Sequence, residues 1–214
     1  LRYLFGGAGG PGYPETSRWA RSLGMFWSHD FSKRIVVAPD HLHVWLITKS
    51  GSFREFENPD LGGIYQTVVP ADEYRSLEWL GGNGWALHDL DGTTTFFLAS
   101  GLWSHTTDRN GHAIEGSYTG NDLTGVTFPD GRTLTLTYAS SGKLASIVET
   151  PVSGSLESPR TWTYSWLAGN YGVQSLQKIT LPDGRRWDFG YDGQVPPHLT
   201  RVRTQQAGVL NEPT

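Results

Sequence analysis

The stretch that decides the fold is Pro129-Asp130-Gly131-Arg132-Thr133-Leu134-Thr135-Leu136-Thr137-Tyr138. An Asp-Gly pair tolerates positive φ at both central positions of a type I′ turn, whose twist matches that of two antiparallel strands. After this turn, Leu134, Leu136 and Tyr138 alternate with threonines. A period of two puts the apolar side chains on one face of a strand and the threonines on the other. The stretch therefore predicts a turn and the half-buried strand that follows it.

The same unit recurs along the second half of the chain. Asp183-Gly184 precedes an alternating strand at the same offsets, and Asn110-Gly111 is a third turn of this kind. Four tyrosines close strand-like stretches, and each is followed by a leucine with a β-branched residue three positions later. The tyrosines are Tyr118, Tyr138, Tyr164 and Tyr191, and the pairs are Leu123/Val126, Leu144/Ile147, Leu176/Ile179 and Leu199/Val202. This self-similarity predicts stacked hairpins, because one hairpin cannot bury its own apolar face.

The first half carries weaker signals of the same kind. Short strands are predicted at 35–37, 44–47, 65–69, 85–87 and 95–98. Residues 71–80 are the one helical candidate, although part of this segment also fits a strand. We expect a glycine- and proline-rich leading segment at 1–24, a β region at 25–107, and repeats at 108–204 with an insertion loop at 150–160. A tail at 205–214 is expected to lead to further repeats, so the chain looks like a piece of something longer.

Composition limits the classes of function. The 214 residues are 37% hydrophobic, enough for a substantial core. The absence of cysteine excludes disulfides and thiolate metal sites, although it does not identify the compartment. The net charge of −4 and the scattered basic residues disfavour nucleic-acid binding. We also expect no membrane span, because no apolar run is long enough.

Catalytic and metal chemistry find little support in the sequence. His41 and His43 would share a strand face, as zinc ligands can, but a third ligand is missing. Ser104 and His105 are adjacent, so on a regular strand they would point to opposite faces. A glycine-rich run at 6–12 lacks the Lys-Ser/Thr of a phosphate loop. The carboxylates that could pair as in a glycosidase are Asp89, Asp91, Glu115 and Asp188. We therefore predict no catalytic residue, no metal and no cofactor, with a glycan-active hydrolase as an alternative.

The nine tryptophans raise a different alternative. Trp187 shares a register with Phe189 and Tyr191, and Trp162 and Trp166 bracket Tyr164 at a period of two, so these rings are expected on a buried face. Trp103 lies out of register with Leu102 and is the best candidate for an exposed ring that stacks on a sugar. A carbohydrate-binding, lectin-like module is thus the second hypothesis.

The repeating motif resembles the YD repeats of bacterial Rhs and wall-associated proteins, which also form the barrel of teneurins and the cocoon subunits of Tc-type toxin complexes. Asp108-Arg109-Asn110-Gly111-His112 is similar to the opening of the first repeats in that family, and residues 129–138 are similar to the repeat body. Upstream, residues 23–31 resemble the segment with which the N-terminal Rhs region begins. Only Tyr191-Asp192 spells the literal dipeptide, and the motif at which such proteins release a C-terminal toxin is absent.

The resemblance implies an all-β fold of tandem antiparallel β-hairpin repeats that forms an arc of a curved, spiralling sheet or shell. It implies a non-catalytic structural fragment that encapsulates or presents a polymorphic toxin, or mediates cell-surface contact. The expected partners are the remaining repeats of the same polypeptide and an encapsulated C-terminal toxin, with cell-surface glycans as a further candidate. The expected location is secreted or on the bacterial cell surface.

Overall fold

The computed structural model describes residues 2–3, 27–39, 41–49, 52–58, 63–69, 74–168, 174–194 and 198–206. Most of the leading segment and of the C-terminal tail, including the glycine-rich run at 6–12, therefore lies outside the described residues. The chain forms two compact units. The first comprises Leu1–Glu15 and Ser28–Asp130, and the second comprises Thr16–Trp27 and Gly131–Thr214. The first repeat hairpin thus belongs to the first unit.

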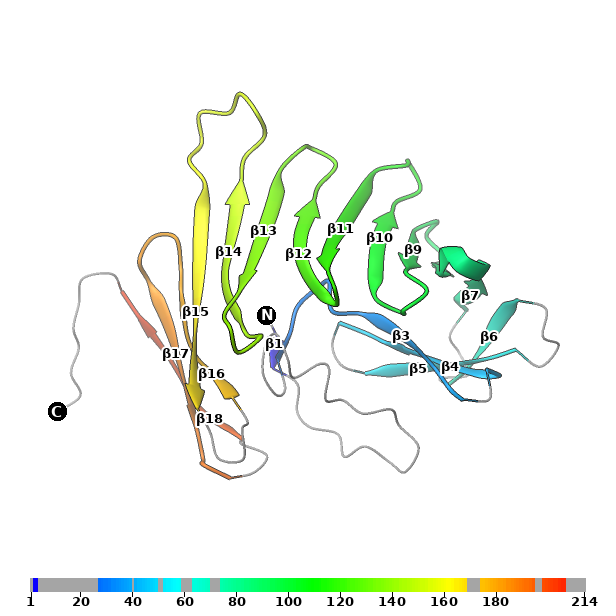
Figure 1. The fold of residues 1–214 in the computed structure, drawn as a ribbon, viewed down its shortest axis with the longest axis horizontal. Helices are drawn as coiled ribbons and strands as arrows, with labels where there is room; N and C mark the ends of the chain where they lie inside the picture. The colour runs from blue at the N-terminus through cyan, green and yellow to red at the C-terminus, as the bar shows by residue number, and fades with distance from the viewer. Residues whose placement is uncertain are drawn as a thin grey trace. The chain divides into compact units, whose positions relative to one another are not determined.

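The described residues are all-β, with antiparallel strands that follow one another in the sheet in chain order (Figure 1). The first unit contributes β3 (Arg34–Val37), β4 (His43–Ile47), β5 (Phe53–Glu57), β6 (Ile64–Val69), β7 (Ser76–Trp79), β8 (Trp85–His88), β9 (Thr94–Phe97), β10 (Trp103–Thr107), β11 (Ala113–Thr119) and β12 (Asp122–Thr127). The second contributes β13 (Thr133–Tyr138), β14 (Leu144–Thr150), β15 (Arg160–Ala168), β16 (Gln174–Thr180), β17 (Arg186–Tyr191) and β18 (Leu199–Gln205). Two-residue strands β1 (Arg2–Tyr3) and β2 (Trp27–Ser28) pair separately. The predicted fold of tandem antiparallel hairpins is confirmed.

Three details differ from the expected strands or add to them. The segment 71–80 contains strand β7 and no described helix, because Leu77 pairs with Tyr65 on one side and Leu87 on the other. Strand β5 was not expected from the sequence pattern. A 3₁₀ turn, η2 (Gly81–Asn83), joins β7 to β8. The loop expected at 150–160 connects β14 to β15.

The sheet of the first unit folds back on itself around a filled core. Its first strand, β3, meets the β9–β10 turn, where the Ile35 N–H donates to the Gly101 carbonyl at 2.8 Å and Arg34 bridges Leu102. Large buried side chains come from nearly every strand: Ile35, Val44, Leu46, Phe56, Tyr65, Leu77, Trp85, Leu87, Phe97, Trp103, Leu123 and Val126. Each such burial stabilises the fold by about 1.5–3 kcal/mol, so hydrophobic packing holds this unit together.

The second unit buries less. Its buried apolar residues among those described are Trp27, Leu136, Leu144, Leu176 and Ile179. Trp187 pairs with Ile179 and Thr204 across neighbouring strands, yet it is 40% exposed. The expectation that Trp187 is buried is therefore wrong. Alternation determines the face on which a side chain lies, but it does not determine whether anything covers that face.

The turns have a different geometry from the one expected. Asn110, Asp130 and Asp183 do not have positive φ, whereas Gly111, Gly131 and Gly184 have φ of 86°, 87° and 81°. In the loop from Asp108 to His112, the Gly111 N–H donates to the Asp108 carbonyl at 3.0 Å. The Asp108 N–H donates in turn to the His112 carbonyl at 3.0 Å. These are the bonds of a three-residue loop with a type I turn and a left-handed glycine, not of a type I′ turn.

The same loop recurs. The described loops that share its two hydrogen bonds are Asp89–Thr93, Leu98–Leu102, Asp108–His112, Ala139–Lys143 and Leu181–Arg185. Each has a glycine with positive φ at its fourth position. One glycine in this conformation, rather than two permissive residues, is therefore what the hairpin turn requires.

Candidate functional site

The first candidate site is the aromatic ladder, a set of aromatic–leucine pairs at the ends of the repeat hairpins. Tyr118 pairs with Leu123, Tyr138 with Leu144 and Tyr191 with Leu199. In each hairpin the register shifts just before the tyrosine. Such a β-bulge re-aims the side chain and bends the strand. The predicted tyrosine and leucine of these three repeats are thus brought together.

The third repeat uses a different aromatic residue. Trp166 follows the bulge and pairs with Leu176, whereas Tyr164 pairs with Ile179. The assignment of Tyr164 as the closing aromatic is therefore wrong. A tryptophan can serve because its indole N–H is a donor, as the tyrosine hydroxyl is. Burial raises the pKa of Tyr164 to about 12.

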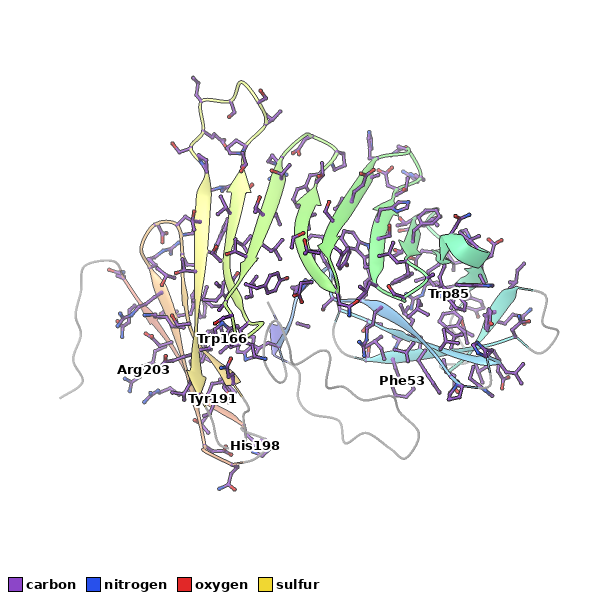
Figure 2. All side chains as sticks on the ribbon, in the orientation of Figure 1. Phe53, Trp85, Trp166, Tyr191, His198 and Arg203 are labelled. Atoms are coloured by element: carbon purple, nitrogen blue, oxygen red, sulfur yellow. The ribbon has the colours of Figure 1, made fainter. Side chains whose placement is uncertain are left out.

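Hydrogen bonds join three of the closing aromatics, Tyr118, Trp166 and Tyr191, to the hairpin before each of them. The Tyr118 hydroxyl donates to the Trp103 carbonyl at 2.7 Å, and the Trp166 Nε1–H donates to the Leu144 carbonyl at 2.8 Å. The Tyr191 hydroxyl donates to the Leu176 carbonyl at 2.8 Å (Figure 2 labels Trp166 and Tyr191). Leu144 and Leu176 are themselves the bulge partners of the preceding repeats. The ladder therefore connects consecutive hairpins through side chains as well as through strand pairing.

Trp103 belongs to a copy of the repeat that the sequence pattern did not reveal. It pairs with Phe97 across the Leu98–Leu102 loop, as Leu144 pairs with Tyr138 across the Ala139–Lys143 loop. The sequence pattern of the repeat is hard to see here, because Phe97 stands at the tyrosine position and Trp103 at the leucine position. The signal that could have found it is Gly101, which stands between them where Gly142 stands in the later copy.

Trp103 is 1% exposed, so the proposal that its ring stacks on a sugar is wrong. Its ring centroid lies 5.0 Å from that of Phe31, and its Nε1–H donates to Thr106 Oγ1 at 2.9 Å. Thr106 occupies the β-branched position of this copy. The ring is buried because it fills the leucine position of the repeat, which is also buried at Leu123, Leu144 and Leu176.

Aspartates hold the turns. Asp108 Oδ1 accepts the N–H groups of Asn110 and His112 at 2.8 and 2.9 Å. Asp192 accepts the N–H groups of Gln194 and His198, both at 3.0 Å. The backbone N–H of His112 lowers the pKa of Asp108 to about 2, and that of His198 does the same for Asp192. These carboxylates serve as turn caps.

The residues weighed for catalysis are engaged in similar contacts. Asp91 Oδ1 accepts the Thr93 N–H at 2.8 Å, and Glu115 on β11 pairs with His105 and Thr127 across the neighbouring strands. Asp188 lies 3.2 Å from Arg186 Nε, and Asp89 lies 3.5 Å from Arg75 Nε. Each contact is between near neighbours in the sheet or turn, as in ordinary structural ion pairs.

The histidines show no ligand-like grouping in the part of the chain that the structure describes. His41 lies in the turn before β4, and His43 Nε2 lies 2.8 Å from Glu57 Oε1. Among the described residues, no three His, Asp or Glu side chains gather as metal ligands. No helix in the described ranges is long and apolar enough to cross a membrane.

Ser104 and His105 do meet, contrary to the expectation from regular alternation. Ser104 Oγ lies 3.1 Å from His105 Nδ1, because the β-bulge between Trp103 and His105 interrupts the alternation. The His105 ring stacks on Phe96 at 4.2 Å. Glu115 lies across the sheet from His105, but no hydrogen bond joins the two side chains among the described residues, so the pair does not form a triad.

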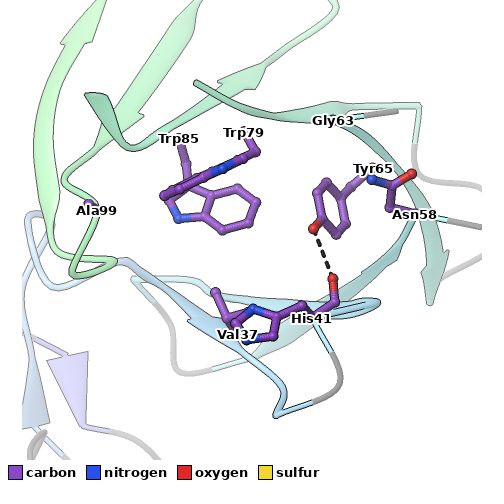
Figure 3. A pocket seen from close by; sticks show the side chains of 8 residues that line it. All are labelled: Val37, His41, Asn58, Gly63, Tyr65, Trp79, Trp85 and Ala99. Carbon is purple, nitrogen blue, oxygen red and sulfur yellow. Dashed lines mark hydrogen bonds between the residues drawn. The ribbon is translucent and has the colours of Figure 1, made fainter. Parts of the chain in front are cut away.

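The second candidate site is the aromatic pocket, a hollow of about 480 Å³ in the first unit (Figure 3). Its lining residues are Val37, His41, Asn58, Gly63, Tyr65, Trp79, Trp85 and Ala99. Figure 3 shows the two indoles overlapping and Tyr65 facing them. The Trp79 and Trp85 centroids lie 4.6 Å apart, and those of Tyr65 and Trp85 lie 5.3 Å apart. The size falls within the range of small-molecule pockets.

Backbone geometry supports the pocket from two sides. Trp79 and Trp85 pair across the turn that contains η2, and the chain leaves this turn through Gly84. Gly84 presses so closely on the β9–β10 turn that a Cβ there would clash with the Phe97 carbonyl oxygen. On the other side the Tyr65 hydroxyl donates to the His41 carbonyl at 3.0 Å. The aromatic rings are thus held by a rigid frame.

Neither the comparison with protein-family models nor the search of curated proteins finds a match to this chain.

Proposed function

We propose that this chain is a non-catalytic structural segment of a β-hairpin repeat protein of the Rhs/YD type. In this proposal it forms part of a β-shell that encapsulates or presents a polymorphic toxin, or that mediates contact at a cell surface. Its partners are further repeats of the same polypeptide and the enclosed C-terminal toxin. The protein acts outside the cytoplasm, secreted or on the bacterial surface.

The aromatic ladder is the observation that carries the proposal. Tyr118, Trp166 and Tyr191 each donate a hydrogen bond to the residue that holds the leucine position of the hairpin before it. Such a contact needs a neighbouring copy, so a hairpin of this design is stable only in an array. A protein built to repeat in this way is suited to forming a wall, because each added copy extends the sheet without changing the contacts.

Ion pairing inside the second unit supports the same reading. Glu149 is 8% exposed and lies on β14, between the turn before β13 and the start of β15. Arg132 Nη1 lies 3.1 Å from its carboxylate, and Arg160 Nη2 lies 2.9 Å from it. A buried carboxylate paired with two guanidinium groups satisfies its charge within the sheet. It therefore supports a structural role better than a catalytic one.

Protease protection on the complete polypeptide that carries this segment tests the proposal. We expect the repeats to resist trypsin and to protect a C-terminal segment that is digested rapidly when expressed alone. Electron microscopy of the same sample should show a hollow particle. A complete polypeptide whose C-terminal segment is digested equally fast with and without the repeats would overturn the encapsulation role.

Hydrolysis assays test the non-catalytic part separately. The chain should not cleave chromogenic glycosides, esters or peptides faster than buffer does, because no nucleophile, base and orienting group converge among the described residues. Turnover that is lost in Asp89→Asn or Asp188→Asn would support the glycan-active hydrolase instead.

A further inference from the structure

We propose that the aromatic pocket is a binding site for a neutral saccharide. The pocket has no part in the aromatic ladder, and none of its lining residues closes a repeat. The inference therefore stands apart from the proposed structural function. A shell segment could lack the site, and the site could exist on a protein that is not a shell.

The stacking surface is provided by an exposed ring on a fixed support. Trp79 is 39% exposed, whereas the neighbouring Trp85 and Tyr65 are 3% and 6% exposed. An indole in contact with both protein and solvent offers a flat apolar surface that is already held in place. The apolar face of a pyranose ring matches such a surface. Little side-chain entropy is then lost on binding, because the buried neighbours hold the ring.

Charge separates a saccharide from the other ligands of aromatic pockets. The eight described lining residues include no Asp, Glu, Lys or Arg, and His41 is the one imidazole among them. Three aromatic rings can also form a cage for a quaternary ammonium group. A phosphate finds no counter-charge among these eight residues, and an ammonium finds no carboxylate to add to the attraction of the rings, so a neutral ligand is the favoured occupant and a quaternary ammonium is the comparison to test.

Hydrogen bonding favours a ligand with hydroxyl groups over a purely apolar one. The Trp85 Nε1–H is buried and donates to no group among the described residues. Buried donors are normally paired, so an unpaired one in the pocket lining is unusual. The Tyr65 oxygen uses its proton on His41 and retains lone pairs that can accept. Saccharide hydroxyls both donate and accept, so one can pair with the Tyr65 oxygen, and one can pair with the Trp85 Nε1–H once the surrounding side chains move to admit an oxygen.

Backbone strain also coincides with the pocket. His41, with φ of 58°, is the one described non-glycine residue in the left-handed region. Strained residues persist where the surrounding structure requires them, and they concentrate at ligand-binding sites. Here the strained residue supplies the carbonyl that orients Tyr65.

Titration of the intact chain tests the inference. The probes are methyl pyranosides of glucose, galactose and mannose, the corresponding tetrasaccharides and, as a cationic comparison, choline. Binding is followed by tryptophan fluorescence and by the indole N–H signals in heteronuclear NMR. We expect one neutral sugar to bind and to shift the Trp85 indole signal. Trp79→Ala should raise its Kd at least about tenfold, which corresponds to roughly 1.4 kcal/mol.

Trp187→Ala is the matched control, because Trp187 is 40% exposed but belongs to the second unit. It should leave the Kd unchanged, while circular dichroism confirms that both variants are folded. Should Trp79→Ala unfold, the shift of the Trp85 indole signal in the natural chain still decides. The inference is overturned if no sugar binds, if both variants weaken binding equally, or if choline binds and the sugars do not.

Discussion

Gly84, Gly101 and Gly111 all have positive φ but differ in their surroundings. Their φ angles are 94°, 82° and 86°. A Cβ on Gly84 would clash with the Phe97 carbonyl oxygen, and one on Gly101 would clash with the Ile35 carbonyl oxygen. A Cβ on Gly111 would meet no heavy atom within 4 Å. Gly101 and Gly111, which occupy the fourth position of the same kind of loop, therefore separate conformational strain from close packing, and Gly84, with ψ of −135°, adds a backbone conformation nearly restricted to glycine.

Alanine substitution at these glycines should give two levels of destabilisation. Gly111→Ala is expected to lower the free energy of unfolding by about 1–2 kcal/mol, the cost of a left-handed alanine. Gly84→Ala and Gly101→Ala should cost about 1–3 kcal/mol more, since the backbone must also move. Urea titration measures all three. Equal costs at the three sites would contradict the close approach of these turns to their neighbours.

Truncation of two tryptophans should give contrasting results. Trp103→Ala removes a ring that is 1% exposed and should cost about 3–5 kcal/mol. Trp187→Ala removes a ring that is 40% exposed and should cost less than about half of that. Thermal and urea unfolding report both. A larger loss at Trp187 would show that its face is covered in solution.

At the scale of the element, the hairpin turns should make stability depend on acid. The pKa values of Asp108 and Asp192 are about 2 in the folded chain, against 3.8 for the unperturbed group. A lowered folded pKa stabilises the fold above the unfolded pKa, and this contribution is lost as pH falls through the folded value. The free energy of unfolding should therefore fall between about pH 4 and pH 2.

Asn at both positions keeps an acceptor oxygen but removes the titrating group. In the double variant Asp108→Asn and Asp192→Asn, the free energy of unfolding should therefore fall less between about pH 4 and pH 2. Urea titration at pH 2 to 5 measures this. If the free energy of unfolding falls as steeply in the double variant as in the natural chain, the turn carboxylates do not contribute to its dependence on acid. Each single variant provides the intermediate control.

The aromatic ladder predicts a graded loss of stability between hairpins. The Tyr191 hydroxyl donates to the Leu176 carbonyl and accepts from Trp27 Nε1 at 3.0 Å, so Tyr191→Phe leaves two groups without their partner. Tyr118→Phe removes one hydrogen bond, the one to the Trp103 carbonyl. We expect about 1–3 kcal/mol for the first and about 0.5–1.5 kcal/mol for the second. Tyr74→Phe is the control because Tyr74 is 75% exposed, and a similar loss there would contradict the ladder.

At the scale of the whole molecule, stability should be uneven along the array. Strands β8 and β9 contribute Trp85, Leu87 and Phe97 to a filled core, whereas most residues of β18 are exposed. Local opening costs least where few apolar contacts must be broken. Amide hydrogen exchange should therefore be slowest in β8 and β9 and faster by orders of magnitude in β18. Uniform protection would show that the two units unfold together.

Local patterns in the sequence determined the hairpins of the second half, most strands of the first, and the face of each side chain where no bulge interrupts the strand. Period-two alternation in Thr133–Tyr138 and a single turn glycine such as Gly184 act over a few residues, so one chain segment suffices to predict them. The leucines at the start of the second strands were found in the same way, because the bulge that pairs them with an aromatic is itself local.

Only the tertiary structure decided which faces are covered and which distant residues meet. It buried Trp103, exposed Trp187 and replaced Tyr164 by Trp166 as the closing aromatic. It also assembled the aromatic pocket from strands β3, β6, β7 and β8 and from turns between Val37 and Ala99. Burial and convergence depend on how the sheet of the first unit folds back so that Ile35 meets Gly101. That contact joins residues far apart in the chain, and alternation within a strand carries no information about it.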